Sequence, residues 1–184
     1  MAKKVLVPVS EGTEEMEAIT IIDMLRRAEL EVIVAGESDI IKCSRMVKII
    51  PDVLFDQIDE NDDFDAIVLP GGNEGTKNLS ENEKLKRILE RQKEKNRMIG
   101  AICAAPTILS KHKILSEGQD VTSHPGVMDQ FENYEYKQDK VVDTGMIVTS
   151  RGAGTAIDFS LNLIEKLADK ETADKVGKAI VYGG

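Results

Sequence analysis

Short apolar runs alternate along the chain with segments whose apolar residues recur every three or four positions. The runs at residues 4–9, 31–35, 65–69, 98–102 and 146–149 have the length and composition of buried strands. Helical spacing is clearest over 14–28, where the apolar positions are Ala18, Ile21, Ile22, Leu25 and Ala28. Further helices are predicted from a Ser80–Glu83 capping box onward, after Cys103, over 156–167, and over about 171–179.

The remaining segments give weaker patterns. Residues 40–50 predict two short β segments, residues 52–61 a short helix or loop, and residues 121–123 a short strand. The alternation of strands and helices predicts an α/β three-layer sandwich with a mostly parallel central sheet. The length of 184 residues favours one domain spanning 1–184. In such sheets, ligands bind outside the carboxyl ends of the strands, where loops 12–17, 70–72, 103–105, 124–125 and 151–155 are expected to meet.

Cys103 stands where a buried strand turns into a helix. Ala101 and Ala105 flank it at the positions where the nucleophile elbow of hydrolases has glycines, and Pro106 suits a first helical turn. Backbone N–H groups at a helix start stabilise a thiolate and an adjacent oxyanion. The alternative is that Cys103 is only a core residue, since free cysteine is among the most buried residue types.

Composition narrows the function classes. The net charge of −9 argues against nucleic acid or an anionic membrane as the main partner. The apolar run at the start is shorter than that of a signal peptide, and no run reaches membrane-spanning length. Two cysteines and two histidines without ligand spacing predict neither a disulfide framework nor a metal site, and the default compartment is the reducing cytoplasm.

Two glycine patterns invite a nucleotide-binding interpretation, and both lack its spacing. Gly71-Gly72 has no following Lys-Ser/Thr, and the pattern from Gly152 to Ile157 has isoleucine where a small residue is needed. No cofactor is therefore expected. Tight turns and an oxyanion role both remain open for these glycines. His124 is either a polar loop residue or a proton shuttle, and Cys43 is interpreted as structural.

Several segments together resemble one known family. Residues 12–17, 69–73, 101–106, 123–125 and 149–155 are similar in order and spacing to the parkinsonism-associated protein deglycase group of the ThiJ/PfpI superfamily, over nearly the whole chain. The resemblance implies a flavodoxin-like fold and a homodimer. It also implies that Cys103 is the nucleophile, that Glu17 is the acid hydrogen-bonded to it, and that His124 lies close by.

The resemblance extends to the surroundings of the sulfur. It implies that backbone N–H groups of Gly72 and Ala104, with Gly71 beside them, form an oxyanion pocket. Met16, Cys43 and Arg45 match the family's dimer contact region, and the last helical segment matches a helix that distinguishes this group from shorter bacterial relatives.

The chemistry of a Cys–Glu pair depends on which group is charged. An ionised Glu17 would raise the pKa of the Cys103 thiol, whereas a buried, protonated Glu17 would donate a hydrogen bond and stabilise the thiolate. We therefore expect a neutral Glu17 beside a mostly ionised Cys103 near pH 7.

Three functions fit such a pair. The first is a glutathione-independent glyoxalase or protein deglycase acting on methylglyoxal, glyoxal or their early adducts with amino groups, through a Cys103 hemithioacetal. The second is a redox-sensing chaperone in the oxidative-stress response, whose Cys103 oxidises to a sulfinate. The third, a cysteine peptidase, is disfavoured because no insertion for peptide binding is evident.

Overall fold

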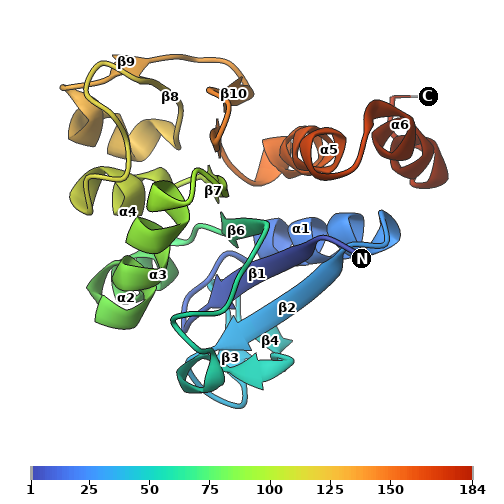
Figure 1. Cartoon of the computed structure of the whole chain (residues 1–184), viewed down its shortest axis with the longest axis horizontal. Helices are drawn as coiled ribbons and strands as arrows, with labels where there is room; N and C mark the ends of the chain where they lie inside the picture. The colour runs from blue at the N-terminus through green and yellow to red at the C-terminus, as the bar shows by residue number, and fades with distance from the viewer. Residues whose placement is uncertain (1, 184) are drawn as a thin grey trace.

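The computed structural model describes residues 2–183 and contains one seven-stranded sheet with helices on both faces (Figure 1). The strands lie in the order β10-β11-β7-β6-β1-β2-β5, and all neighbours are parallel except β10 and β11. The sheet strands are β1 (Lys4–Val9), β2 (Glu31–Gly36), β5 (Val53–Leu54), β6 (Ala66–Leu69), β7 (Met98–Ile102), β10 (Val141–Asp143) and β11 (Ile147–Ser150). The three-layer α/β sandwich and its mostly parallel sheet are confirmed.

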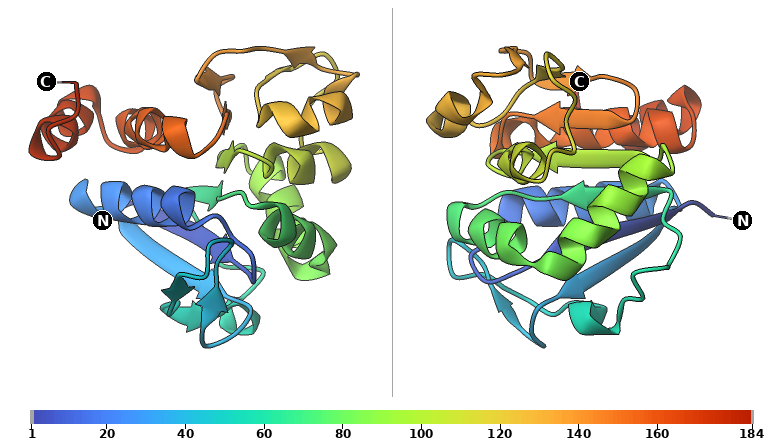
Figure 2. Two further views of the ribbon diagram at one scale, coloured as in Figure 1. Left: turned by 180° about the vertical axis from the view of Figure 1, so that it is seen from behind. Right: turned by 60° about the vertical axis from the view of Figure 1, so that its left-hand side comes forward.

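The helices divide between the two faces, as both views of Figure 2 show. One face is covered by α1 (Glu15–Arg27), α5 (Ala156–Leu167) and α6 (Lys170–Ala179), which pack around buried residues such as Leu25 and Phe159. The opposite face is covered by α2 (Asn73–Glu81), α3 (Glu83–Glu94) and α4 (Pro106–Lys111), with Leu89 and Ile108 in its core. Strands that are buried on both faces are apolar throughout, which explains the continuous runs in the sequence.

Shorter elements complete the chain. A hairpin, β3 (Ile41–Lys42) and β4 (Lys48–Ile49), confirms the two β segments predicted at 40–50, and β8 (Asp120–Val121) pairs with β9 (Glu135–Tyr136) outside the main sheet. Three 3₁₀ segments follow strands or loops: η1 (Phe55–Gln57), η2 (Pro125–Phe131) and η3 (Ala153–Thr155).

One local prediction is wrong. Ser80 does not cap a helix, because it lies inside the unpredicted helix α2 and its hydroxyl donates to the Lys77 carbonyl. The residue that caps α3 is Asn82, whose side chain accepts a hydrogen bond from the Leu85 N–H at 3.0 Å. The helix after Cys103 begins only at Pro106 and has six residues, so the helix-dipole contribution at the sulfur is smaller than the sequence suggested.

The five central strands lie in the order β2-β1-β6-β7-β11, which is 2-1-3-4-5 when these five are numbered along the chain. The order reverses between β1 and β6. The register places Leu69 beside Ala101 and Ile102 beside Ser150. As a result, the loops that follow β6, β7 and β11 leave the sheet at the same edge, next to the loop after β1.

Candidate active site

A cavity of about 540 Å³ lies at this carboxyl edge of the sheet. It is lined by residues from loops that are far apart in the sequence: Gly12, Glu14, Glu17, Ser44, Arg45, Gly72, Asn73, Glu74, Cys103, His124 and Ala153. The structure therefore brings Cys103, Glu17 and His124 to one cavity. Each of the five loops that the sequence predicts to meet at this edge contributes at least one residue to the lining of the cavity.

Cys103 sits on a strained turn directly after β7. Its φ of 63° is in the left-handed region, which residues other than glycine rarely adopt and which is common at functional sites. Its backbone is held from two sides, because its N–H donates to the Ser150 carbonyl at 3.0 Å and its carbonyl accepts from the His124 N–H at 2.8 Å. The turn leaves the side chain partly exposed at the cavity. This is the geometry of a nucleophile elbow.

Glu17 reaches the site from the first turn of α1 and is wholly buried. Its Oε2 accepts a hydrogen bond from the Gly71 N–H at 2.8 Å, while Oε1 is buried without a partner among residues 2–183. Burial raises the pKa of Glu17 to about 7, opposed by the Gly71 N–H and the adjacent Cys103 thiol, and the charge of Glu14 raises it further. Below that pH the acid is neutral, whereas near pH 7, where the sequence predicts a neutral acid, it is about half ionised.

The carboxyl and the thiol ionise as a pair, because each charge disfavours the other. With Glu17 ionised, burial and that charge raise the pKa of Cys103 to about 12, so one negative charge is shared over the range between about 7 and about 12. The N–H groups of Gly72 and Ala104 lower the pKa of the sulfur, whereas only the Gly71 N–H serves the carboxyl. These two N–H groups stabilise a thiolate, but burial and the charge of Glu17 outweigh them in the Cys103 pKa of about 12, so the shared charge lies mainly on Glu17. The thiolate beside a neutral acid stays a prediction.

The glycine pair after β6 has two different roles. Gly71 does not present its N–H to the cavity, because this group is bonded to Glu17, and its carbonyl accepts from the Glu14 N–H at 2.9 Å. A Cβ on Gly71 would lie 2.6 Å from the Cys103 Cβ and 2.7 Å from the Glu17 Oε2, so only glycine fits between the pair. Gly72 has a φ of 95° and lies against the Gly12 carbonyl, which excludes any side chain. Of the two, only Gly72 is positioned as an oxyanion donor.

His124 is exposed and borders the cavity. Its Nδ1 accepts a hydrogen bond from the Gly126 N–H at 3.1 Å, so in the neutral ring the proton is on Nε2. The structure places this side chain at the cavity without a hydrogen bond to the Cys103 sulfur in residues 2–183.

The residues matched to a dimer contact region lie in three different environments. Met16 is 61% exposed on α1, Cys43 is buried, and Arg45 is exposed at the edge of the cavity. Burial, and next the charge of Glu15, raise the pKa of Cys43 to about 11, which fits the structural role expected for this thiol.

The family is decided by comparison with known proteins. A model described as the DJ-1/PfpI family matches residues 3–166. The chain belongs to the DJ-1/PfpI family. Protein dj-1beta of Drosophila melanogaster is 44% identical over 185 residues, which cover 98% of each chain. The glutathione-independent glyoxalase DJR-1.2 of Caenorhabditis elegans is 38% identical over 173 residues, covering 92% of this chain and 91% of that relative.

The same family is found among solved structures. The crystal structure of Drosophila melanogaster DJ-1beta matches with a TM-score of 0.95 and 42% identity over 100% of both chains. The resemblance identified from the sequence motifs and the flavodoxin-like fold are thus confirmed.

Two DJ-1/PfpI site features were missed from the sequence. Glu15 lies in the acidic first turn of α1, where carboxylates usually face solvent as partners of the helix dipole, yet it is buried and accepts hydrogen bonds from the Ser44 hydroxyl and the Arg45 N–H, both at 2.7 Å. Glu14 is the N-cap, and its Oε2 accepts from the Glu17 N–H at 2.8 Å. The spacing of three residues between Glu14 and Glu17 is the signal that could have revealed this cap.

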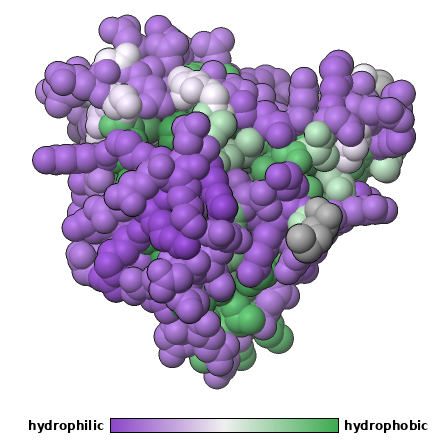
Figure 3. All heavy atoms as spheres, in the orientation of Figure 1, coloured by the Kyte–Doolittle hydropathy of each residue, from purple (hydrophilic) through white to green (hydrophobic). Residues whose placement is uncertain are grey.

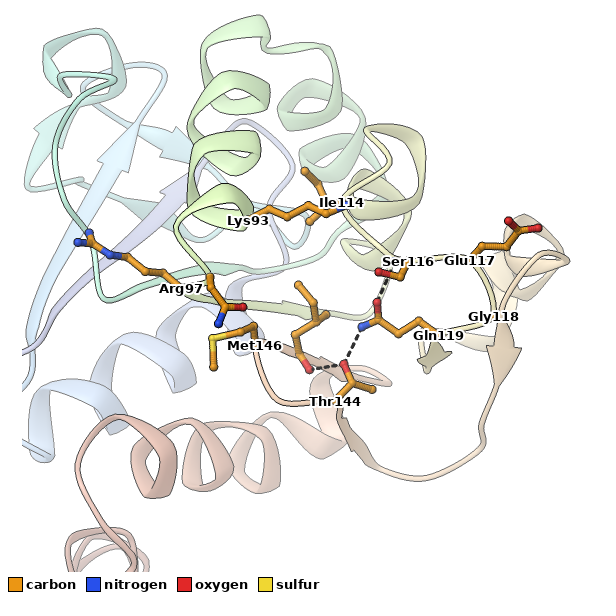
Figure 4. Close-up of a pocket in the computed structure, with 11 residues that line it drawn as sticks. Lys93, Arg97, Ile114, Ser116, Glu117, Gly118, Gln119, Thr144 and Met146 are labelled. Carbon is orange, nitrogen blue, oxygen red and sulfur yellow. Dashed lines mark hydrogen bonds between the residues drawn. The ribbon is translucent and has the colours of Figure 1, made fainter.

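A separate cavity of about 560 Å³ lies at the opposite end of β7 and β11 (Figure 4). In its wall, the Gln119 side chain accepts from the Ser116 N–H at 2.9 Å and donates to the Thr144 hydroxyl at 2.6 Å. It contains neither cysteine nor histidine. Within residues 2–183, no group of three or more His, Cys, Asp or Glu side chains could hold a metal ion, and no helix is long and apolar enough to span a membrane.

Proposed function

We propose that this chain is a Cys103-dependent enzyme acting on 2-oxoaldehydes such as methylglyoxal and glyoxal, without glutathione, and on their early adducts with amino groups. The observation that carries the proposal is Cys103 itself, partly exposed on a strained turn between the N–H groups of Gly72 and Ala104 and the buried carboxyl of Glu17. The relative named as a glutathione-independent glyoxalase supports this choice of reaction.

The reaction needs only groups of this cavity and water. The Cys103 thiolate adds to the aldehyde carbon, and the carbonyl oxygen takes the proton of Glu17, which gives a hemithioacetal. The Glu17 carboxylate or His124 then removes the hydrogen on that carbon, and a proton is returned to the neighbouring carbonyl carbon through an enediol. The product is a thioester of a 2-hydroxy acid. Water hydrolyses it, so that methylglyoxal plus water gives lactate and the thiol is restored.

The N–H groups of Gly72 and Ala104 suit the charge that develops on oxygen in the addition and hydrolysis steps. In an adduct on an amino group, the thiolate replaces the amine: the carbon–sulfur bond forms as the carbon–nitrogen bond breaks, and the amine leaves with the proton of Glu17. The resulting hemithioacetal then follows the same path. The test is lactate formation from methylglyoxal by the wild type, by Cys103→Ser and by Glu17→Gln. Activity in the wild type that is lost in Cys103→Ser supports the proposal, whereas equal lactate formation by Cys103→Ser rules it out.

A second function, a redox-sensing chaperone, is favoured by the partial exposure of the same sulfur. The N–H donors and a protonated Glu17 would stabilise a sulfinate on Cys103, while Cys43 is buried. Intact mass after mild peroxide, with chaperone activity measured before and after, tests this role. If Cys103 stably gains two oxygens and chaperone activity does not change, the redox-sensing chaperone role is ruled out.

We also propose a homodimer through α1 and the β3–β4 hairpin. Large apolar side chains are exposed there: Met16 (61%), Ile19 (47%), Met46 (69%), Val47 (48%) and Ile50 (79%). Apolar surface is visible over β3 and β4 at the lower end of Figure 3. Patches of this kind mark association surfaces. Light scattering of wild type and Ile50→Glu tests it: a monomeric wild type at micromolar concentration contradicts the proposal.

A further inference from the structure

A second cavity, of about 410 Å³, adjoins the Cys103 site. Helices α2 and α4 and the segment η2 form its walls. Asn73 lines both this cavity and the one at Cys103, and Ala104 lines it directly after Cys103 in the chain. The oxyanion donors Gly72 and Ala104 therefore stand between the two spaces, so a substrate held at the sulfur has this cavity next to it.

The second cavity is positively charged in a chain whose net charge is −9. Lys77 and Lys111 line it, and none of its lining residues is acidic. Within residues 2–183 neither lysine forms an ion pair; the Lys111 ammonium donates only to the carbonyl and hydroxyl of Ser80, at 3.0 and 3.1 Å. The cavity at Cys103 has the opposite character, since three glutamates and one arginine line it. An anionic group would therefore be favoured in the second cavity over the first.

A buried polar side chain of the second cavity also lacks a partner. Thr76 is 5% exposed, and its buried hydroxyl oxygen has no hydrogen bond within the described part of the chain. Asn73 and Gln130 also line the cavity, and their exposed amides are open to solvent or to a ligand. Buried polar groups are normally paired, so the unpaired Thr76 hydroxyl is a candidate partner for a ligand in this cavity. In the cavity of Figure 4, by contrast, the Gln119 amide and the Thr144 hydroxyl are bonded to each other.

We propose that this second cavity is a subsite for a phosphate group carried by the substrate, with the reactive oxoaldehyde at Cys103. Two lysines balance a phosphate dianion, and the neighbouring hydroxyl and amide groups can donate to its oxygens. The inference rests on the proposed function for its catalytic meaning, but phosphate binding itself can be measured independently of turnover.

The binding test is a titration with inorganic phosphate, at constant ionic strength, followed by backbone amide NMR. We expect saturable shifts at Thr76, Lys77 and Lys111, with an affinity that falls about ten-fold or more in Lys77→Met/Lys111→Met. The matched control is Lys170→Met/Lys178→Met, which removes the same charge from exposed positions of α6 and should bind as the wild type does. Shifts that do not saturate, or an affinity unchanged in Lys77→Met/Lys111→Met, would overturn the proposal.

The kinetic test compares 3-phosphooxy-2-oxopropanal with 3-hydroxy-2-oxopropanal, which differ only in the phosphate. In Lys77→Met/Lys111→Met, KM for the phosphorylated compound should rise about ten-fold, while its kcat stays unchanged. Both KM and kcat for the hydroxyl compound should stay unchanged. Equal effects on both compounds count against the subsite and leave the proposed function in place. Phosphate binding without turnover of either compound supports the anion site and counts against the proposed enzyme.

Discussion

Replacement of Glu17 by glutamine tests the central electrostatic claim about the site. Burial raises the pKa of this carboxyl from 4.5 to about 7, whereas in the unfolded chain it returns to an ordinary value. Between these values the folded protein binds more protons than the unfolded one. The free energy of unfolding therefore decreases as pH rises, by about 1.4 kcal/mol per pH unit from this group. The stability contribution of the neutral acid is fully present below about 4.5 and is lost as pH rises through about 7.

Glutamine removes this titration and keeps the shape of the side chain. Because the sequence pI is about 4.9, the measurement is best begun above it. From about pH 5.5 to pH 8.5, the wild type should lose about 2 kcal/mol relative to Glu17→Gln. Urea denaturation followed by circular dichroism gives both free energies, and the difference between the two proteins cancels the other titrating groups.

The matched control is Glu94→Gln, at an exposed position in the last turn of α3. Its stability curve should run parallel to that of the wild type over the same range. If the Glu17→Gln and wild-type curves are also parallel, the acid is not held neutral by burial, and the account of the Cys103–Glu17 pair is wrong. The ultraviolet absorbance of the thiolate, followed in the same samples, shows whether the negative charge that forms near pH 7 lies on Cys103.

Three further substitutions test packing around the site and in the core. Gly71→Ala places a methyl group between the thiol of Cys103 and the acid beside it, and should lower kcat/KM for methylglyoxal by about ten-fold or more, as measured by lactate release. Gln92→Leu removes the amide that donates to the Phe64 and Met98 carbonyls at 3.1 Å each, although Arg97 still donates to the Phe64 carbonyl at 3.3 Å, and should cost about 1–3 kcal/mol in urea denaturation. Phe159→Ala removes a wholly buried ring between α5 and the sheet, and should cost about 3–5 kcal/mol in the same assay.

The central strands and the position of the nucleophile could be predicted because each is signalled locally. A strand buried on both faces is a continuous apolar run, and a cysteine between such a run and a helix marks a turn at the edge of the sheet. The strands β1, β6 and β7 and the turn at Cys103 lie where these patterns indicate. Helices α1 and α5 are predicted to within about two residues for a similar reason, since each has one apolar face.

Other elements depend on contacts that the sequence does not display. Helix α2 has one large buried apolar side chain, Leu79, and is otherwise buried through the small residues Gly75 and Thr76, so it lacks an apolar stripe. Strands β5 and β10 have two and three residues and exist by pairing with the sheet edges. The hydrogen-bond partner of the Gly71 N–H could not be predicted either. From the sequence this group could equally have faced the substrate, and only the folded position of Glu17 shows that it donates to the acid.

The first turn of α1 shows why neighbouring residues of one type need not share one role. Successive residues of a helix point about 100° apart, so Glu14, Glu15 and Glu17 face different surroundings. Glu14 caps the helix, Glu15 holds the loop that carries Ser44 and Arg45, and Glu17 enters the site beside Cys103. Because one rigid turn fixes all three, the acid next to the sulfur and the hairpin loop at the cavity rim are positioned by the same short segment.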